Sequence, residues 1–260
     1  DPQMVRQARR NLGAVGLSDR VEVIEGDALK VIPALKGEYD FVFLDAVKSD
    51  YDEYFAGIEE KLVPGAVIAA DNTIRYAGAM KGFLGRLFTG PAYDAVTVRA
   101  SMKKRDGMTL AWKVPPEHRD PDPASRLKHA RDMDPRTAVD TIILRILAEV
   151  AGAHRGTAVG ASVPAALDMG IAFERTGGRL SLLAAAPGTA QAIKTAGLEK
   201  TVSVDAGDVI ASLRAADTID FLCIDAPGCD YRDCLEAAEP RMPAGSLIVV
   251  DSCDAVAAAA

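Results

Sequence analysis

Two acidic strand ends and a nearby lysine are the groups in this chain best suited to chemistry. Asp45 closes one short apolar run, and Asp71 with Asn72 closes the next. Lys48 follows Asp45 by three residues. Three oxygen-bearing side chains and an amine can together bind and orient a polar ligand, provided that the fold brings them to one place.

The elements that must position these groups are predicted by the pattern between Tyr39 and Asn72. The apolar runs 41–44 and 66–70 favour strands, and the amphipathic segment 51–62 between them favours a helix. A strand–helix–strand unit places its two strands parallel and usually adjacent. Their carboxyl ends then meet at the edge where α/β sheets bind ligands.

The composition is that of an ordinary globular protein without a nucleic-acid or membrane partner. Of the 260 residues, 49% are hydrophobic and 26% are charged, and the net charge is −7. The strongest basic run is only Lys103-Lys104-Arg105, which favours a solvated turn over a nucleic-acid patch. No apolar run approaches the roughly 18 residues that indicate a membrane span. We expect a cytoplasmic protein.

The cysteines give no metal signature. Cys223, Cys229, Cys234 and Cys253 form no CxxC pair and have no histidine nearby. Reduced thiols are the favoured interpretation for a cytosolic protein. A disulfide and a zinc site are the alternatives.

Further helices and strands are predicted around the central unit of the first part. The expected elements are helices at 2–15, 28–35 and 76–89, a strand at 21–25, and a hairpin made of 93–100 and 108–114. Together they make an α/β, doubly wound sheet that ends in an antiparallel hairpin. Residues 115–134, rich in proline and charge, are expected to form a linker.

Strand and helix patterns alternate again in residues 135–260, and they repeat the first part. Five pairs of matching residues are each separated by 180 positions: Asp40 and Asp220, Asp45 and Asp225, Tyr51 and Tyr231, Gly65 and Gly245, Asp71 and Asp251. The sequence therefore predicts two copies of one Rossmann-like domain, at 1–114 and 135–260.

Each copy lacks an element that the other has. The first has no N-terminal strand, and the second has no C-terminal hairpin. We interpret the sequence as a fragment cut at both ends. The alternative is a permuted arrangement in which the predicted strand 156–161 completes the first sheet.

The copies differ where chemistry is expected. Gly228 stands in the second copy where the first has Lys48, and Ser252 stands where the first has Asn72. The loop after strand 156–161 is also poor in glycine, which a phosphate- or nucleoside-binding loop needs. The second copy is therefore expected to be degenerate and non-catalytic.

Four segments of the chain together carry a family resemblance: DPQMVRQARRNL, VEVIEGDA, YDFVFLDAVKSDYDEY and GAVIAADNTIRYAG. They resemble the cation-dependent class I O-methyltransferases, which include the caffeoyl-CoA and catechol O-methyltransferases. The resemblance covers 1–114 closely and 135–260 loosely. Its most specific part is the combination of D-A-x-K-x-x-Y with A-D-N.

The resemblance implies a methyl-transfer site that uses S-adenosylmethionine (SAM) and a divalent cation, with Mg²⁺ the expected ion. It implies that the cation is bound by Asp45, Asp71 and Asn72, and that Lys48 is the general base. The positions that match the family's cofactor contacts are Asp27, Ala28 and Asp45. A plain helix cap is the alternative role for Asp27. The family's glycine loop and ribose-binding acid would precede Asp1.

These groups suit methyl transfer to a phenol, whose pKa is near 10 when free. A cation on both oxygens of a vicinal diol stabilises the anion, and two carboxylates with one amide leave about three positions open on Mg²⁺. Because a bound cation carries the same sign of charge as the Lys48 ammonium group, it is expected to lower the pKa of Lys48.

The predicted function is therefore SAM-dependent, metal-assisted methyl transfer to a hydroxyl of a small catechol-like or other phenolic acceptor. A non-catalytic binding or scaffold protein on the same fold is the alternative. A dinucleotide oxidoreductase is disfavoured, because segment 156–173 lacks a G-x-G-x-x-G loop. Either a homodimer or an intramolecular pairing of the two copies is the expected association.

Overall fold

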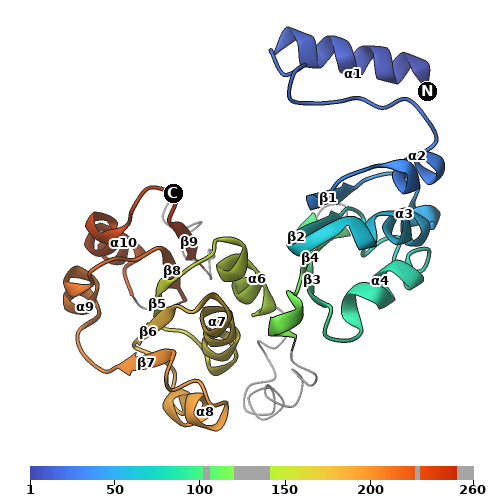
Figure 1. Cartoon of the computed structure of the whole chain (residues 1–260). Coiled ribbons are helices and arrows are strands. Elements are labelled where there is room, and N and C mark those ends of the chain that lie inside the picture. The colour runs from blue at the N-terminus through green and yellow to red at the C-terminus, as the bar shows by residue number, and fades with distance from the viewer. Residues whose placement is uncertain (102–105, 120–140, 226–228, 251–260) are drawn as a thin grey trace.

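The computed structural model describes residues 1–101, 106–119, 141–225 and 229–250, which form two β-sheets with their helices (Figure 1). The predicted basic turn 103–105, nearly all of the predicted linker, and Asp251, Ser252 and Cys253 lie outside these ranges. In the part of the chain that is described, no helix is both long enough and apolar enough to cross a membrane.

The first sheet has the strand order β1-β2-β4-β3. Its strands are β1 (Tyr39–Leu44), β2 (Leu62–Ala70), β3 (Tyr93–Ser101) and β4 (Asp106–Lys113). Strands β1 and β2 are parallel, as predicted, while β4 runs antiparallel to both β2 and β3. The predicted hairpin is therefore confirmed.

Helices of the first half pack against one face of this sheet. They are α2 (Ala28–Ala34), α3 (Tyr51–Ile58) and α4 (Lys81–Phe88), with the short 3₁₀ helices η1 (Lys48–Asp50) and η2 (Glu59–Lys61) flanking α3. The core between these helices and the sheet includes Tyr51, Phe55 and Phe83, all fully buried. Edge-to-face aromatic contacts join Phe55 and Phe83 at 5.3 Å between ring centroids.

Two expectations for the first half were wrong. Residues 21–25 are coil rather than a strand, because a strand needs a hydrogen-bonded neighbour and residues 1–38 form only α1 (Pro2–Ala14) and α2. Helix α4 begins at Lys81 rather than at position 76, because residues 71–80 form a run of turns. Helix α1 itself is as predicted, with no buried side chain, and stands away from the sheet (Figure 1).

The second sheet is fully parallel, with the order β7-β6-β5-β8-β9. Its strands are β5 (Arg155–Val159), β6 (Arg179–Leu183), β7 (Val202–Asp205), β8 (Phe221–Ile224) and β9 (Leu247–Val250). Because β5 pairs with β6 and β8, the permuted alternative is wrong: this strand does not complete the first sheet.

Helices cover both faces of the second sheet, so it is doubly wound. They are α6 (Ile142–Val150), α7 (Val163–Thr176), α8 (Thr189–Thr195), α9 (Val209–Ala215) and α10 (Tyr231–Ala238), with the 3₁₀ turn η4 (Glu239–Arg241). One core packs strands against α6, α7 and α8, and another packs them against α9 and α10. A further 3₁₀ turn, η3 (Pro116–His118), follows β4.

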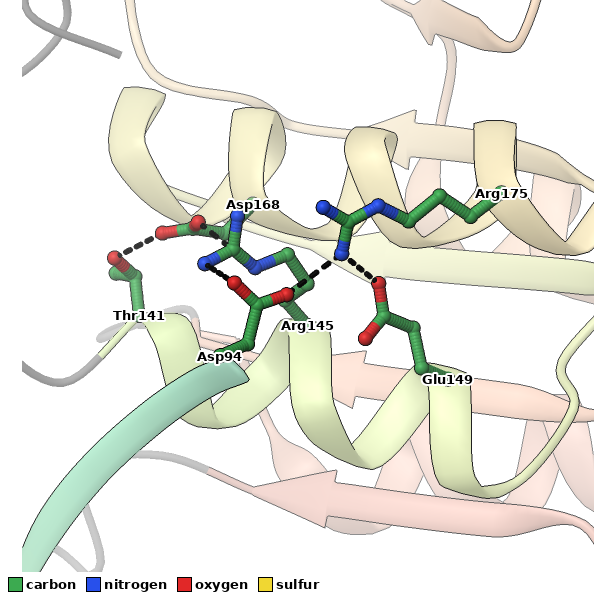
Figure 2. A network of polar contacts seen from close by, with 6 residues as sticks. All are labelled: Asp94, Thr141, Arg145, Glu149, Asp168 and Arg175. Carbon is green, nitrogen blue, oxygen red and sulfur yellow. Dashed lines mark hydrogen bonds and ion pairs between the residues drawn. The ribbon is translucent and has the colours of Figure 1, made fainter. Parts of the chain in front are cut away.

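The two halves touch through α6, which lies against both β3 and α7. Trp112 and Val96 of the first sheet form one buried apolar cluster with Ile146. Beside this cluster, the carboxylate of Asp94 forms ion pairs with Arg145 at 2.9 Å and with Arg175 at 2.6 Å (Figure 2). This contact is consistent with the predicted intramolecular pairing.

Candidate functional site

The ends of β1 and β2 bring the two predicted acids to one edge of the first sheet. Leu44 is paired in register with Ala70. The pairing continues one step further, because the backbone N–H of Asp71 donates to the carbonyl of Leu44 at 3.0 Å. Asp45 and Asp71 are therefore the first residues beyond two adjacent parallel strand ends, at the edge where such sheets bind ligands.

Lys48 points back to this edge from η1. Its ammonium donates hydrogen bonds to Asp45 Oδ1 and to the hydroxyl of Tyr51, both at 2.8 Å. The Tyr51 hydroxyl in turn donates to the carbonyl of Leu44 at 2.8 Å. The Lys48 side chain is 17% exposed and that of Asp45 is 53% exposed, so the pair faces solvent from the Asp45 side.

These contacts set the protonation of Lys48. Burial lowers its pKa, but the hydrogen bonds to Asp45 and Tyr51 raise it more, so the pKa lies above its ordinary value. The ammonium form is thus favoured while Asp45 has no other cationic partner. The predicted lowering of this pKa by a bound cation stays a prediction.

Asn72 is held in an unusual backbone conformation with a defined amide partner. Its φ is 62°, in the left-handed region that asparagine tolerates better than most residues. Its Nδ2 donates to Asp106 Oδ2 at 3.1 Å. The same carboxylate accepts the backbone N–H groups of Arg75 at 3.0 Å and Gly107 at 2.8 Å.

Asp106 is ionised in this setting. Burial raises its pKa, but the backbone N–H groups of Arg75 and Gly107 and the amide of Asn72 outweigh that effect, so the pKa lies below its usual range. A carboxylate without a proton can only accept hydrogen bonds.

The predicted cofactor residues Asp27 and Ala28 lie at the start of α2. Asp27 is the N-cap of this helix, and its side chain accepts the N–H of Leu29 at 3.1 Å. Burial raises the pKa of Tyr54, with smaller contributions from Asp50 and Asp27. Asp27 is thus near α3, and its contact with a cofactor stays a prediction.

Two residues of this edge were missed as site residues by the sequence reasoning. Neither Asp106 nor Tyr51 was among the residues predicted for the site. Tyr51 is indeed fully buried, yet it also fixes Lys48. The signal for Asp106 was topological: β4 runs antiparallel to β2, so the start of β4 must lie beside the end of β2, where Asn72 follows.

The oxygen donors of this edge fit a hard cation such as Mg²⁺. Asp45 and Asp71 supply carboxylates, and the contact of Asn72 Nδ2 with Asp106 leaves its Oδ1 available. Across the described residues, no group of three or more His, Cys, Asp or Glu side chains could hold a metal ion. The proposed set contains only two such side chains, Asp45 and Asp71, because its third member, Asn72, is an amide.

The matching edge of the second sheet is described only in part. Asp225 follows β8, and its N–H donates to Val159 of β5 at 2.9 Å. Residues 226–228 and Asp251 are outside the described part. Nearby, the thiol sulfurs of Cys229 and Cys234 lie 2.8 Å apart, and burial first and Cys229 second raise the pKa of Cys234 to about 12.

Comparison with known proteins finds O-methyltransferases that are similar to the first half. A family model described as O-methyltransferase matches residues 1–81. A catechol O-methyltransferase of Niastella koreensis is 31% identical over 128 residues, which cover 43% of this chain and 58% of that protein. A catechol O-methyltransferase of Mycobacterium tuberculosis is 35% identical over 123 residues, covering 42% of this chain and 56% of that protein.

Among solved structures, the O-methyltransferase TomG of Streptomyces achromogenes in complex with SAM matches with 26% identity and a TM-score of 0.41. That match covers 44% of this chain and 59% of TomG. The chain spans a little over half the length of the curated relatives it matches first. Its first 81 residues are thus similar to O-methyltransferases, and relatives of its first half carry that name.

Proposed function

We propose that the first half carries the cation and base groups of a SAM-dependent O-methyltransferase site. The acceptor is a hydroxyl of a small catechol-like or other phenolic molecule. The proposal is supported by the family match of residues 1–81 and by relatives named catechol O-methyltransferase. The observation that carries it is the 2.8 Å pair of Lys48 with Asp45, next to the adjoining strand end that bears Asp71 and Asn72.

In this proposal Asp45, Asp71 and Asn72 hold a divalent cation through oxygen atoms. A bound cation would supply Lewis-acid chemistry that lowers the pKa of the acceptor hydroxyl. Asp27 and Ala28, together with Asp45, lie on the cofactor side. Mg²⁺ is the proposed ion because all the proposed donors are hard oxygens.

Lys48 acts on the proton of the acceptor hydroxyl. As the neutral amine, Nζ of Lys48 would take that proton, and S-adenosylmethionine would supply the methyl group. Tyr51 keeps Nζ at the edge through its hydroxyl, which is itself anchored on Leu44. Holding the reacting groups in this order supplies part of the rate enhancement.

The second half is proposed to be a degenerate, non-catalytic copy of the same fold. The order strand, helix, 3₁₀ turn, strand recurs in β1-α3-η2-β2 and in β8-α10-η4-β9. The 180-residue offset of the matching positions supports a repeat. A cytoplasmic location and a homodimer stay predictions.

The test is methylation of catechol by the full-length protein, with SAM and Mg²⁺ supplied. Asp71→Ala combined with Asn72→Ala removes two of the three proposed ligands, and we expect the activity to fall below detection. Asp225→Ala removes an acid at the second edge, where Asp225 corresponds to Asp45, and should leave the rate within about twofold. Methylation that survives the Asp71 and Asn72 changes would contradict the proposed mechanism.

A further inference from the structure

A buried carboxylate lies directly behind the amide of Asn72 and has no part in the chemistry proposed above. Asp106 is 5% exposed, and its side chain is surrounded by donors. Oδ1 accepts the backbone N–H groups of Arg75 and Gly107, and Oδ2 accepts Asn72 Nδ2. The backbone N–H groups therefore hold this carboxylate in place, and the carboxylate in turn orients the Asn72 side chain.

This contact decides which end of the Asn72 amide faces Asp106. A primary amide has donor hydrogens on its nitrogen and only acceptor sites on its oxygen. Because Asn72 Nδ2 donates to Asp106 Oδ2 at 3.1 Å, the nitrogen faces the carboxylate and the oxygen faces away. The left-handed φ of 62° at Asn72 fixes the direction in which the side chain leaves the main chain.

The hairpin holds this arrangement through several contacts with the 71–75 loop. The N–H of Thr73 donates to the carbonyl of Gly107 at 3.0 Å, and Thr109 Oγ1 donates to Thr73 Oγ1 at 2.8 Å. A Cβ at Gly107 would lie 2.4 Å from the carbonyl oxygen of Val98, so this close approach requires glycine.

We infer that Asp106 is a positioning residue that keeps the Asn72 amide oxygen free to bind the cation. The inference rests on the proposed function, since it concerns how one of the proposed ligands is oriented. Residues that orient metal ligands from behind typically change metal affinity by about 10–100-fold when replaced. Asp106 is therefore expected to affect cation affinity without touching the cation.

The first test replaces the carboxylate by its isosteric amide. In Asp106→Asn, the new side-chain oxygen can still accept the N–H groups of Arg75 and Gly107. Its NH₂ group, however, faces the NH₂ group of Asn72, so the Asn72 amide turns over and its oxygen becomes an acceptor for the new amide. We expect Mn²⁺ affinity, measured by titration calorimetry on the full chain, to fall about 10–100-fold.

The second test exchanges the two groups. In Asp106→Asn with Asn72→Asp, the amide at position 106 donates to one oxygen of the new carboxylate at position 72, and the other oxygen remains for Mn²⁺. We expect the double variant to bind within about threefold of the wild type. A residue that merely stabilises the fold would not be rescued by this exchange, and if Asp106→Asn fails to fold, the double variant alone decides.

Thr109→Val is the matched control. It removes a hydroxyl that holds the same loop through Thr73 but does not contact Asn72. Mn²⁺ affinity should stay within about threefold of the wild type. If this variant binds as weakly as Asp106→Asn, general order of the loop sets the affinity and the inference is wrong.

The outcomes separate the inference from the proposed function. If the wild type binds Mn²⁺ and Asp71→Ala abolishes binding, yet Asp106→Asn binds like the wild type, only the inference fails. If the exchange does not restore affinity to a folded double variant, the inference fails as well. Should the wild type not bind Mn²⁺ at all, the proposed cation site is wrong and the inference falls with it.

Discussion

Strands β1 and β8 have the same kind of apolar sequence but different surroundings. Phe41 and Phe221 are separated by 180 positions, yet Phe41 is 57% exposed and Phe221 is fully buried. Strand β8 lies between β5 and β9 and beneath α7, where Phe173 contacts Phe221 edge-to-face. Among the described residues, β1 is an edge strand that pairs with β2 alone. An apolar strand pattern therefore shows what a strand can bury, and the neighbouring elements decide what it does bury.

The polar residues that follow the strands also differ between the two halves, and here the first half has the more specific contacts. At the first edge, Lys48 and Asn72 each have a specific partner, in Asp45 and Asp106 respectively. The matching positions of the second half are glycine and serine. Because the second half still forms its sheet, the scaffold does not need the lysine or the asparagine in order to fold. This comparison supports the proposed functional role of these two residues.

The largest predicted effect is on the chemistry of the first edge. Lys48→Met should lower the rate of catechol methylation about 10²–10⁴-fold, because it removes the proposed base. Lys61→Met is a matched control: this lysine belongs to the same strand–helix–strand unit but donates to the carbonyls of Ile32 and Pro33. Equal rates for the two variants would remove Lys48 from the mechanism.

The comparison of the two strands is tested by a pair of equivalent substitutions. Phe221→Ala should lower the free energy of unfolding by about 3–5 kcal/mol, since it opens a cavity in a packed core. Phe41→Ala should change it by no more than about 0.5 kcal/mol, because that side chain is mostly exposed. Urea denaturation measures both. A large cost for Phe41→Ala would mean that this face of β1 is covered in solution.

The contact between the halves depends on a buried charge network (Figure 2). Arg145→Met removes one of two arginines that pair with Asp94, and leaves a buried carboxylate with one cation fewer. We expect unfolding to become easier by about 3–5 kcal/mol, or to separate into two transitions. The exposed pair of Arg232 and Glu236 supplies the control, because Arg232→Met should leave the free energy of unfolding nearly unchanged.

The smallest predicted effect is a pH dependence of stability at the same contact. Burial raises the pKa of Glu149 to about 7. Arg175 and Arg145 oppose this increase, while Asp94 adds to it. The folded state then holds this proton at pH values where the unfolded chain, with an ordinary glutamate, has lost it. The contribution to stability is therefore fully present below about pH 4.5 and is lost as the pH rises to about 7.

Thermal unfolding between pH 5 and pH 8 measures this effect. The wild type should lose on the order of 1–3 kcal/mol over that range relative to Glu149→Gln, which has no proton to lose there. A profile that is identical in the two proteins would show that Glu149 is ionised throughout.

Much of the first edge could be predicted because its signals are local. The apolar runs, the helix between them and the acids that follow them gave β1, α3, β2 and the adjacency of Asp45 and Asp71. The prediction of a strand at 21–25 was wrong, because the apolar pattern of that segment says nothing about whether a partner strand exists. Asp106 was missed because its role depends on a contact 34 positions away in sequence, which only the antiparallel pairing of β4 with β2 creates.

The number of cations that one chain binds tests the central claim most directly. Binding of Mn²⁺ to the full chain can be followed by the loss of the electron paramagnetic resonance signal of the free ion. We predict one site per chain, which Asp71→Ala removes and Asp225→Ala leaves intact. Two equivalent sites, no site, or one site that is lost with Asp225 instead of Asp71 would contradict the assignment of the first edge as the functional one.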